Sequence, residues 1–207
     1  MRIQAYGERA LLVDLPDLDA VHVLADLLAA TGDPRILDVV PAAETLLVVV
    51  AEPGDLAGVA EVVAGLDTST STKHHELAEP VPIPVRYDGA DLDAVAEATG
   101  LTRTGVVERH AGPVYSVDFM GFLPGFAYLS GLDPVLHLPR LETPRTRVPA
   151  GSVAIAGERC AVYPRESPGG WRLLGHTDVV MFDLAADPPA LLRAGLRVRF
   201  EPIGAPR

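Results

Sequence analysis

Two hydrophobic periods alternate along the first third of the chain. Alternating apolar positions over residues 2–14, interrupted at Gly7, predict a β-hairpin. Apolar side chains then recur every three or four positions over residues 18–28, which predicts an amphipathic helix with Asp17 as its N-cap. Two more strands and a second helix follow, over 35–40, 45–51 and 56–66. This order predicts a small open sheet that carries both helices on one face.

The pattern stops at residues 67–84, where Ser, Thr, His and Pro replace the apolar repeat. This composition is typical of a linker or a boundary, so we predict domains at 1–80 and 81–207. Within it, His74 and His75 are neighbours whose side chains point in different directions. They make a poor metal pair, and we expect solvated linker residues.

The second domain is predicted to consist mainly of short strands. Its opening residues PIPVRYDG read as a strand, and two helices follow over 90–100, which ends at Gly100, and 102–112. In the next strand, Tyr115, Val117 and Phe119 alternate with polar residues that should face the opposite side.

Further short strands separated by Gly and Pro are expected over 152–157, 160–164, 171–175, 178–184 and 196–203, with one brief helix over 188–194. Many short strands at this spacing predict a closed or nearly closed barrel. The predicted fold class is therefore α+β, with a small open-sheet domain followed by a β-barrel domain.

Between Gly121 and Trp171 neither hydrophobic period holds, because turn glycines and prolines are mixed with aromatic residues and arginines. The sequence Leu-Pro-Gly-Phe at 123–126 predicts a type II turn. Its neighbouring aromatic residues either surround a displayed bend or pack inward at a barrel corner. A second corner is expected at 167–170, where consecutive backbone N–H groups could bind an anion.

Charge sets this segment apart from the rest of the protein. The chain has 17 basic and 28 acidic residues, a formal net charge of −11. Residues 139–172 instead hold six arginines against three glutamates, a net +3 that leaves −14 for the remainder. A small anionic ligand or an acidic partner surface is the natural guest of such a region. Binding of nucleic acid is disfavoured, because a sequence pI near 4.9 would repel a polyanion elsewhere.

The arginines allow two interpretations. Arg140, Arg145 and Arg147 alternate with prolines in what we expect to be an extended, stiffened loop. Arginine suits the bidentate recognition of a carboxylate. The alternative is that each arginine pairs with its own acidic neighbour at the surface.

Other chemistry is limited by composition. Lys73 is the only lysine, and its context excludes a phosphate-binding P-loop, a Schiff-base enzyme and a biotin carrier. Cys160 has no partner for an internal disulfide and is expected to be a buried, inert thiol. His110 could carry a proton, but we favour a helix-end cap. No apolar run is long enough for a membrane span or signal peptide, so a cytoplasmic protein is expected.

Nucleophilic and metal chemistry find little support. Ser152 and Ser167 lack the Gly-x-Ser-x-Gly elbow, and no sequence spacing pairs either serine with a base. We also find no metal cluster in the sequence and predict no protein-ligated metal.

Three motifs resemble a known family, namely GFLPGFAYL at 121–129, PRLETPRTRVPAGSV at 139–153 and YPRESPGGW at 163–171. They resemble the B subunit of 5-oxoprolinase, a family that includes the KipI-type sensor-kinase inhibitor. It is also labelled allophanate hydrolase subunit 1 and is akin to half of the carboxyltransferase domain of urea carboxylase. Weaker matches at GERALL near the start and VRFEPI near the end extend the resemblance over essentially the whole chain.

The resemblance implies an N-terminal α+β domain and a cyclophilin-like β-barrel. It further implies a role beside the C subunit and the A subunit of the enzyme, the latter of the LamB/YcsF type, in opening the lactam of 5-oxo-L-proline to L-glutamate with hydrolysis of ATP. ATP would be held by the complex, because this chain shows no nucleotide motif, and the chain alone is expected to be inactive. The alternatives are a KipI-type inhibitor of a sensor histidine kinase and half of a urea/allophanate-type carboxyltransferase.

We predict a substrate-binding or subunit-interface role for the residues of the three motifs. These are Phe122, Pro124, Gly125, Phe126, Tyr128, Arg140, Arg145, Arg147, Gly151, Ser152, Tyr163, Arg165, Ser167, Pro168, Gly169, Gly170 and Trp171. One position departs from the pattern, since His176 stands where the resemblance leads us to expect arginine. No catalytic residue can be assigned.

Overall fold

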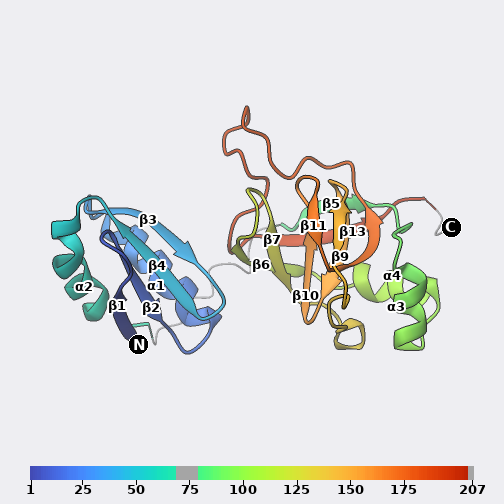
Figure 1. Ribbon diagram of the computed structural model, residues 1–207, viewed down its shortest axis with the longest axis horizontal. Helices are drawn as coiled ribbons and strands as arrows, with labels where there is room; N and C mark the ends of the chain where they lie inside the picture. Colours follow the sequence, from blue (N-terminus) through green and yellow to red (C-terminus); the bar gives the residue numbers. More distant parts are fainter. Residues whose placement is uncertain (69–78, 205–207) are drawn as a thin grey trace. The chain divides into compact units, whose positions relative to one another are not determined.

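The computed structural model describes residues 1–68 and 79–204 in two compact units, Met1–Glu76 and Leu77–Arg207. Figure 1 shows the elements of each unit. The predicted linker residues Lys73, His74 and His75 lie outside the described residues.

The first unit is a four-stranded antiparallel sheet with the strand order β1-β2-β4-β3. Its elements are β1 (Arg2–Ala5), β2 (Ala10–Asp14), α1 (Leu18–Thr31), β3 (Ile36–Pro41), β4 (Thr45–Val50), the 3₁₀ turn η1 (Pro53–Asp55) and α2 (Leu56–Gly65). The predicted hairpin, strands and helices of this region are therefore confirmed.

Both helices of the first unit pack on the same face of the sheet. Leu24 of α1 and Val63 of α2 are fully buried in one apolar cluster with Val48 of β4. The helix α1 begins as predicted, since the side chain of Asp17 accepts a hydrogen bond from Ala20 N at 2.8 Å. It ends at Gly32, whose φ of 59° is the left-handed conformation that glycine tolerates best.

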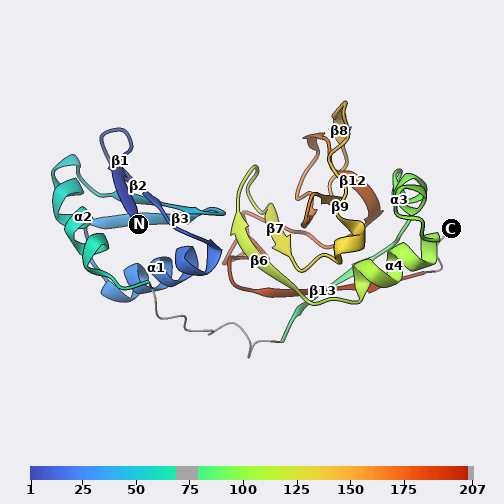
Figure 2. The same ribbon diagram turned by 90° about the horizontal axis from the view of Figure 1, so that it is seen from below.

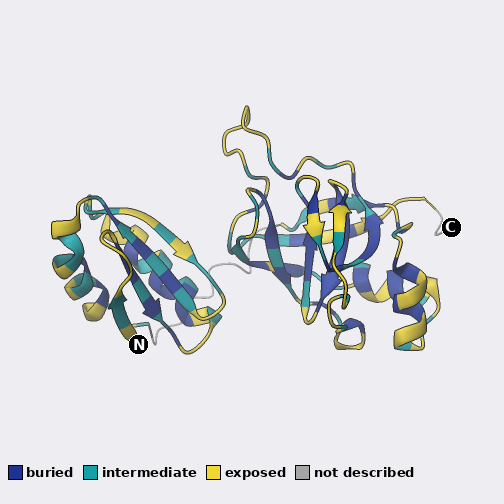
Figure 3. Cartoon of the chain, viewed as in Figure 1, coloured by how far each residue is buried: buried dark blue, intermediate teal, exposed yellow. Residues whose placement is uncertain are grey.

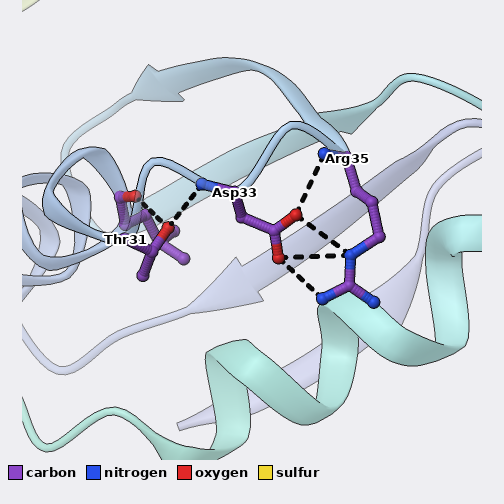
Figure 4. A network of polar contacts seen from close by, with 4 residues as sticks. Thr31, Asp33 and Arg35 are labelled. Carbon is purple, nitrogen blue, oxygen red and sulfur yellow. Dashed lines mark hydrogen bonds and ion pairs between the residues drawn. The ribbon is translucent and has the colours of Figure 1, made fainter.

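A network of polar contacts holds the turn between α1 and β3 (Figure 4). The Thr31 hydroxyl donates to Leu28 O and accepts from Asp33 N. Arg35 then donates from its backbone N–H and its guanidinium to the Asp33 carboxylate, with Nη2 at 2.6 Å from Oδ2. These hydrogen bonds from Arg35 lower the pKa of Asp33 to about 2. The network thus fixes the chain where it passes from helix to strand.

The second unit is built around a seven-stranded sheet with the order β12-β9-β10-β7-β6-β13-β5. The sheet strands are β5 (Val81–Val85), β6 (Tyr115–Met120), β7 (Ala127–Ser130), β9 (Ser152–Ala156), β10 (Arg159–Val162), β12 (Arg172–His176) and β13 (Arg197–Pro202). Two strands, β8 (Arg145–Val148) and β11 (Ser167–Gly169), form a separate ribbon. The remaining elements are α3 (Leu92–Thr99), α4 (Arg103–Ala111) and the 3₁₀ turn η2 (Pro134–Leu136).

The seven-stranded sheet closes on itself into a barrel. Its edge strands meet where Arg86 and His176 form an isolated bridge, with two backbone hydrogen bonds of 2.8 and 2.7 Å. The helices α3 and α4 pack against each other, and α4 also packs against β13 (Figure 2). Side chains such as Leu129, Ile155 and Phe200 fill one continuous core. The predicted barrel is therefore confirmed.

The prediction for residues 178–194 is wrong. Neither the strand expected at 178–184 nor the helix expected at 188–194 forms, and the segment is an irregular loop, largely exposed (Figure 3). Pro188 and Pro189 supply no backbone N–H to a helix. The backbone instead pairs with itself, because Leu191 N donates to Met181 O and Asp183 N donates to Pro189 O.

The alternation predicted for the strand β6 breaks at Asp118. The pairing register with β7 shifts between Val117 and Phe119, so Asp118 is an extra residue in a β-bulge. Its carboxylate is buried, accepts a hydrogen bond from Ser130 Oγ at 2.6 Å and contacts the Arg159 guanidinium. Asp118 lies with Ser130 and Arg159 on the face opposite the core residue Val117, as the alternation predicted, and the ion pair explains why a carboxylate is tolerated in a buried position. The face predicted for Phe119 is wrong, because its ring stacks on Tyr128, which packs in a different cluster from Val117, with ring centroids 4.6 Å apart.

Candidate functional site

The connection between β6 and β7 displays one aromatic side chain. Gly125 has a φ of 80°, and Phe126 N donates to Leu123 O at 2.9 Å, so the predicted type II turn is confirmed. Just before it, Leu123 N donates to Gly121 O at 2.7 Å. This tight turn places Phe122 at a φ of 63° with 59% of its surface exposed. Such a backbone angle costs free energy for a bulky residue and marks a candidate contact site.

The other aromatic residues of the segment form a second apolar core. Phe126, Tyr163 and Trp171 are buried against one another, with ring centroids 5.3 to 5.6 Å apart for the pairs that involve Phe126. They cover Ala154 and Ala156, whereas Val153 and Ile155 of the same strand face the barrel core. The turn-rich segment thus folds back over the outer face of the barrel wall, and β9 is buried on both faces. Tyr128 is only partly buried beside them.

The predicted anion-binding corner at 167–170 does not form. Ser167–Gly169 is instead the strand β11, which pairs with Val148 and Arg145 of β8. Neither Gly169 nor Gly170 has a positive φ, so the backbone N–H groups do not converge as a nest requires. Gly169 serves packing, because a Cβ there would lie 2.3 Å from the Tyr163 hydroxyl oxygen. Pro168 is exposed.

The predicted arginines are not brought to a single place. Arg140 lies over the Trp171 ring, with Cζ 5.9 Å from the centroid. Arg147 pairs with Glu166 at 2.6 Å in an exposed ion pair. Arg145 pairs with Asp91, and Arg165 lines a different pocket from both. The alternative of one acidic neighbour for each arginine therefore describes Arg145 and Arg147.

Two of these arginines line the cavity that we call the Arg145 pocket, of about 310 Å³. Its lining residues are Asp88, Gly89, Ala90, Arg145, Arg147, Pro149, Ser152, Leu173, Gly175 and His176. The pocket joins the β8 ribbon to the seam where the barrel closes, so it gathers residues from distant parts of the sequence. Its volume is near the lower end of the ~300–1,000 Å³ range of small-molecule sites.

Arg145 is held in this pocket by Asp91. Its Nη2 donates to Asp91 Oδ1 at 2.6 Å, while Asp91 Oδ2 accepts from Leu173 N at 2.7 Å. Asp91 is buried, and the two hydrogen bonds satisfy both of its oxygens. Arg145 Nη1 is also buried but has no hydrogen-bond partner. Buried donors are nearly always paired, so this nitrogen is a reason to consider a ligand.

The backbone packs closely beside the pocket residues Ser152 and His176. Gly151 has a φ of 77°, and a Cβ at this position would lie 2.2 Å from Thr177 O. His176 lies beside it, and its Nε2 is 3.2 Å from Asp178 Oδ1. Asp178 also pairs with the guanidinium of Arg86 at 2.8 Å. The position that departs from the family pattern is therefore part of both the pocket and the barrel seam.

A second cavity, which we call the Arg165 pocket, has a volume of about 420 Å³. It is lined by Pro124, Pro164, Arg165, Phe182, Asp183 and Leu184. The type II turn contacts the irregular loop here, since a Cβ on Gly125 would lie 2.6 Å from Phe182 Cβ. The predicted site residues are thus divided among the two pockets, the aromatic core, the β8–β11 ribbon and the exposed turn at Phe122.

The prediction for His110 is wrong, because its side chain lies in the core and does not cap a helix end. Nδ1 is 2.8 Å from the Tyr87 hydroxyl, and Nε2 is 3.1 Å from Cys160 Sγ. Full burial lowers the pKa of His110 to about 3 and raises the pKa of the Cys160 thiol. The expectation of a buried thiol is confirmed, and the three side chains satisfy one another away from solvent.

Sequence reasoning missed the residues that complete the Arg145 pocket from the start of the second unit. Asp88 and Asp91 lie in the segment YDGAD, in which we expected the end of a strand and the start of a helix. In the structure the segment lies between β5 and α3. The signal was a pair of carboxylates beside Gly89. A Cβ on Gly89 would lie 2.4 Å from Leu173 O, which is the packing that brings this segment to β12.

Comparison with known proteins identifies the family. A family model described as carboxyltransferase domain, subdomain C and D, matches residues 1–192. The chain is also 43% identical over 176 residues to the B subunit of 5-oxoprolinase from Escherichia coli O157:H7, covering 82% of this chain and 79% of that protein. The chain belongs to the 5-oxoprolinase B-subunit family. The resemblance found in the three motifs is thereby confirmed.

Solved structures share the fold of this chain. The crystal structure of TTHA0988 superposes on 96% of this chain with a TM-score of 0.82 at 37% sequence identity. The Kluyveromyces lactis urea carboxylase shares the fold, with a TM-score of 0.74 at 19% identity. The matched region is 40% of the TTHA0988 chain and 22% of the carboxylase chain. This fold therefore also occurs within much longer polypeptides.

The described residues contain neither a membrane-spanning helix nor a metal cluster. Every helix within residues 1–68 and 79–204 is too short or too polar to span a bilayer. Across the same ranges, His, Cys, Asp and Glu side chains form no group of three or more that could hold a metal ion.

Proposed function

We propose that this chain is the B subunit of an ATP-dependent 5-oxoprolinase, which opens the lactam of 5-oxo-L-proline to L-glutamate. The observation that carries the proposal is the 43% identity to the B subunit of 5-oxoprolinase over 82% of the chain. The three motifs that resemble this family lie in the second unit, around the two pockets.

The chemistry of the reaction explains why one subunit is insufficient. A lactam resists water because its amide is stabilised by resonance, so hydrolysis must be coupled to ATP. Transfer of the γ-phosphoryl group to the carbonyl oxygen would create a phosphate leaving group and release ADP. Water would then add to that carbon and the ring C–N bond would break, which would leave an acyl phosphate of glutamate. A second water molecule would hydrolyse this acyl phosphate to L-glutamate and phosphate. Guanidinium groups and oriented N–H donors stabilise the negative charge that develops.

The chain itself offers guanidinium groups but no nucleotide motif. Its single lysine, Lys73, lies outside the described residues and outside any P-loop sequence. We propose that ATP is held by the complex with the C subunit and the LamB/YcsF-type A subunit. The Arg145 pocket is the place where this chain would contribute to substrate binding, because it combines two arginines with a small volume.

The test is reconstitution of the activity. The three subunits, co-expressed and purified together, should release ADP and L-glutamate in equal amounts when 5-oxo-L-proline and ATP are both present. The isolated chain should release neither. A stable complex of the three that cleaves no ATP in response to 5-oxo-L-proline would refute the proposal.

A second candidate is half of a urea/allophanate-type carboxyltransferase. It is favoured by the description of the matching family and by the shared fold with urea carboxylase. Such an enzyme needs biotin on a carrier, which this chain does not provide because its single lysine lacks a carrier context. Recovery of an avidin-reactive partner protein with the tagged chain would support this candidate, and its absence would count against it.

A further inference from the structure

We propose that the Arg145 pocket binds the carboxylate of a small amide-bearing acid, and that Glu166 occupies this carboxylate's place when no ligand is bound. The inference rests on the proposed function, which supplies the substrate class. Its residues are Arg145 and Arg147 as the carboxylate donors and Glu166 as the internal substitute. All three side chains belong to this chain, and their contacts lie within its second unit.

The two arginines are spaced to act on one ligand. Arg145 and Arg147 both belong to the strand β8, whose pairing with β11 has a register shift. Both line the pocket. Two guanidinium groups that line one pocket can hold both oxygens of a single carboxylate.

The two arginines differ in how firmly they are held. Arg145 is anchored by Asp91, which is itself fixed by Leu173 N, so its orientation is set before any ligand arrives. Arg147 is three-quarters exposed and paired to the half-exposed Glu166, an ion pair of the kind that solvent weakens. The anchored arginine would position a ligand, and the exposed arginine would exchange one carboxylate for another.

The local charge favours exchange over simple addition of an anion. Three carboxylates already lie at the pocket or at its two arginines, because Asp88 lines the pocket, Asp91 pairs with Arg145 and Glu166 pairs with Arg147. A ligand carboxylate added to them would be a fourth negative charge beside two positive charges. When Glu166 leaves Arg147, the ligand replaces a carboxylate already present there, and the local charge is unchanged. The rearrangement also supplies an acceptor for Arg145 Nη1, which is shielded from water and has no hydrogen-bond partner.

The experiment compares two ligands on the purified complex without ATP, so that no turnover occurs. Isothermal titration measures the binding of 5-oxo-L-proline and of 2-pyrrolidinone, which is the same lactam without a carboxylate. We expect Arg147→Met to weaken 5-oxo-L-proline binding by about tenfold or more and to leave 2-pyrrolidinone binding unchanged. Glu166→Gln should strengthen 5-oxo-L-proline binding by about two- to fivefold, because it removes the competing carboxylate.

Two further variants test whether the change in affinity is specific to the Arg145 pocket. Arg145→Lys keeps a cation for Asp91 but removes the second guanidinium nitrogen, so it should fold and still lose about tenfold in 5-oxo-L-proline affinity. Arg199→Met, at an exposed arginine of β13 outside the three motifs and both pockets, is the matched control and should change neither affinity. Weaker binding to Glu166→Gln, unaltered binding to Arg147→Met and Arg145→Lys, or no binding to the wild-type complex would overturn the inference.

The binding experiment and the test of the proposed function can give different answers. Carboxylate-dependent binding that Arg147→Met abolishes, in a complex that never cleaves ATP, would support the pocket and refute the reaction. Turnover of 5-oxo-L-proline with an unaltered KM in Arg145→Lys and Arg147→Met would support the reaction and refute the pocket.

Discussion

Single residues decide most of what this chain can do, and burial decides their chemistry. His110, Tyr87 and Cys160 would each be reactive in water, but in the core they bond to one another. Arg145 has the same residue type as the exposed Arg147, yet Asp91 and burial make it an anchor. The environment, more than the residue type, therefore separates structural polar groups from candidate binding groups.

The buried histidine predicts an acid-sensitive fold. The native pKa of His110 is about 3, below the unfolded value of about 6.5, so the unfolded state binds a proton first as the pH falls. The contribution of neutral His110 is complete above pH 6.5 and is lost toward pH 3. Between pH 6 and 4, the free energy of unfolding of the wild type should fall faster than that of His110→Gln, by up to about 1.4 kcal/mol per pH unit. Urea denaturation at several pH values measures this, and parallel losses in the two proteins would contradict it.

At the scale of elements, the turn-rich segment between Gly121 and Trp171 forms structure that neither hydrophobic period predicts. It builds the β8–β11 ribbon and lays an aromatic layer over the outer wall of the barrel. Glycines at special positions make this possible. Gly151 combines a left-handed backbone with a close approach to Thr177 O, whereas Gly157 has a similar φ of 57° but open space around it.

This contrast gives a matched pair of variants. Gly157→Ala should cost about 1 kcal/mol, because only the left-handed backbone disfavours alanine there. Gly151→Ala should cost at least about 3 kcal/mol, because its Cβ also collides with the backbone oxygen of Thr177. Urea denaturation of both variants tests the pair, and equal costs would show that the close approach is relieved without penalty.

At the scale of the whole molecule, each unit has a core of its own. The first unit buries Val48 among residues of α1, α2 and the sheet, and the barrel buries Val153 in a separate cluster. The chain has one tryptophan, Trp171, which belongs to the second unit. Its fluorescence therefore reports the barrel, whereas far-UV circular dichroism reports both units.

Separate cores predict separable unfolding. Val48→Ala should destabilise the first unit by about 2 kcal/mol, because it leaves a cavity in the core of that unit. It should leave the Trp171 fluorescence transition in place, because Trp171 belongs to the second unit. Val153→Ala, equally buried in the barrel, should shift the fluorescence transition to lower urea concentration. A shift of the fluorescence transition by Val48→Ala would show that the two units unfold together.

Capping and turn residues in the sequence predicted much of the fold. Asp17 and Gly100 marked helix ends, and Leu-Pro-Gly-Phe at 123–126 marked its turn, because each depends on backbone preferences that act within a few residues. Residues 178–194 misled the same reasoning. Their apolar side chains suit a strand or a helix, but proline and pairing across the loop left neither.

The sequence by itself determined the period of each regular element, the family and the segment where polar chemistry concentrates, because these follow from residue types in local order. Only the tertiary structure decided which arginines share a pocket. Arg145 meets Asp91 across 54 residues of sequence, and His176 meets Arg86 at the seam that closes the barrel. Contacts at that separation depend on how strands pair and where the sheet closes, and no local preference encodes them.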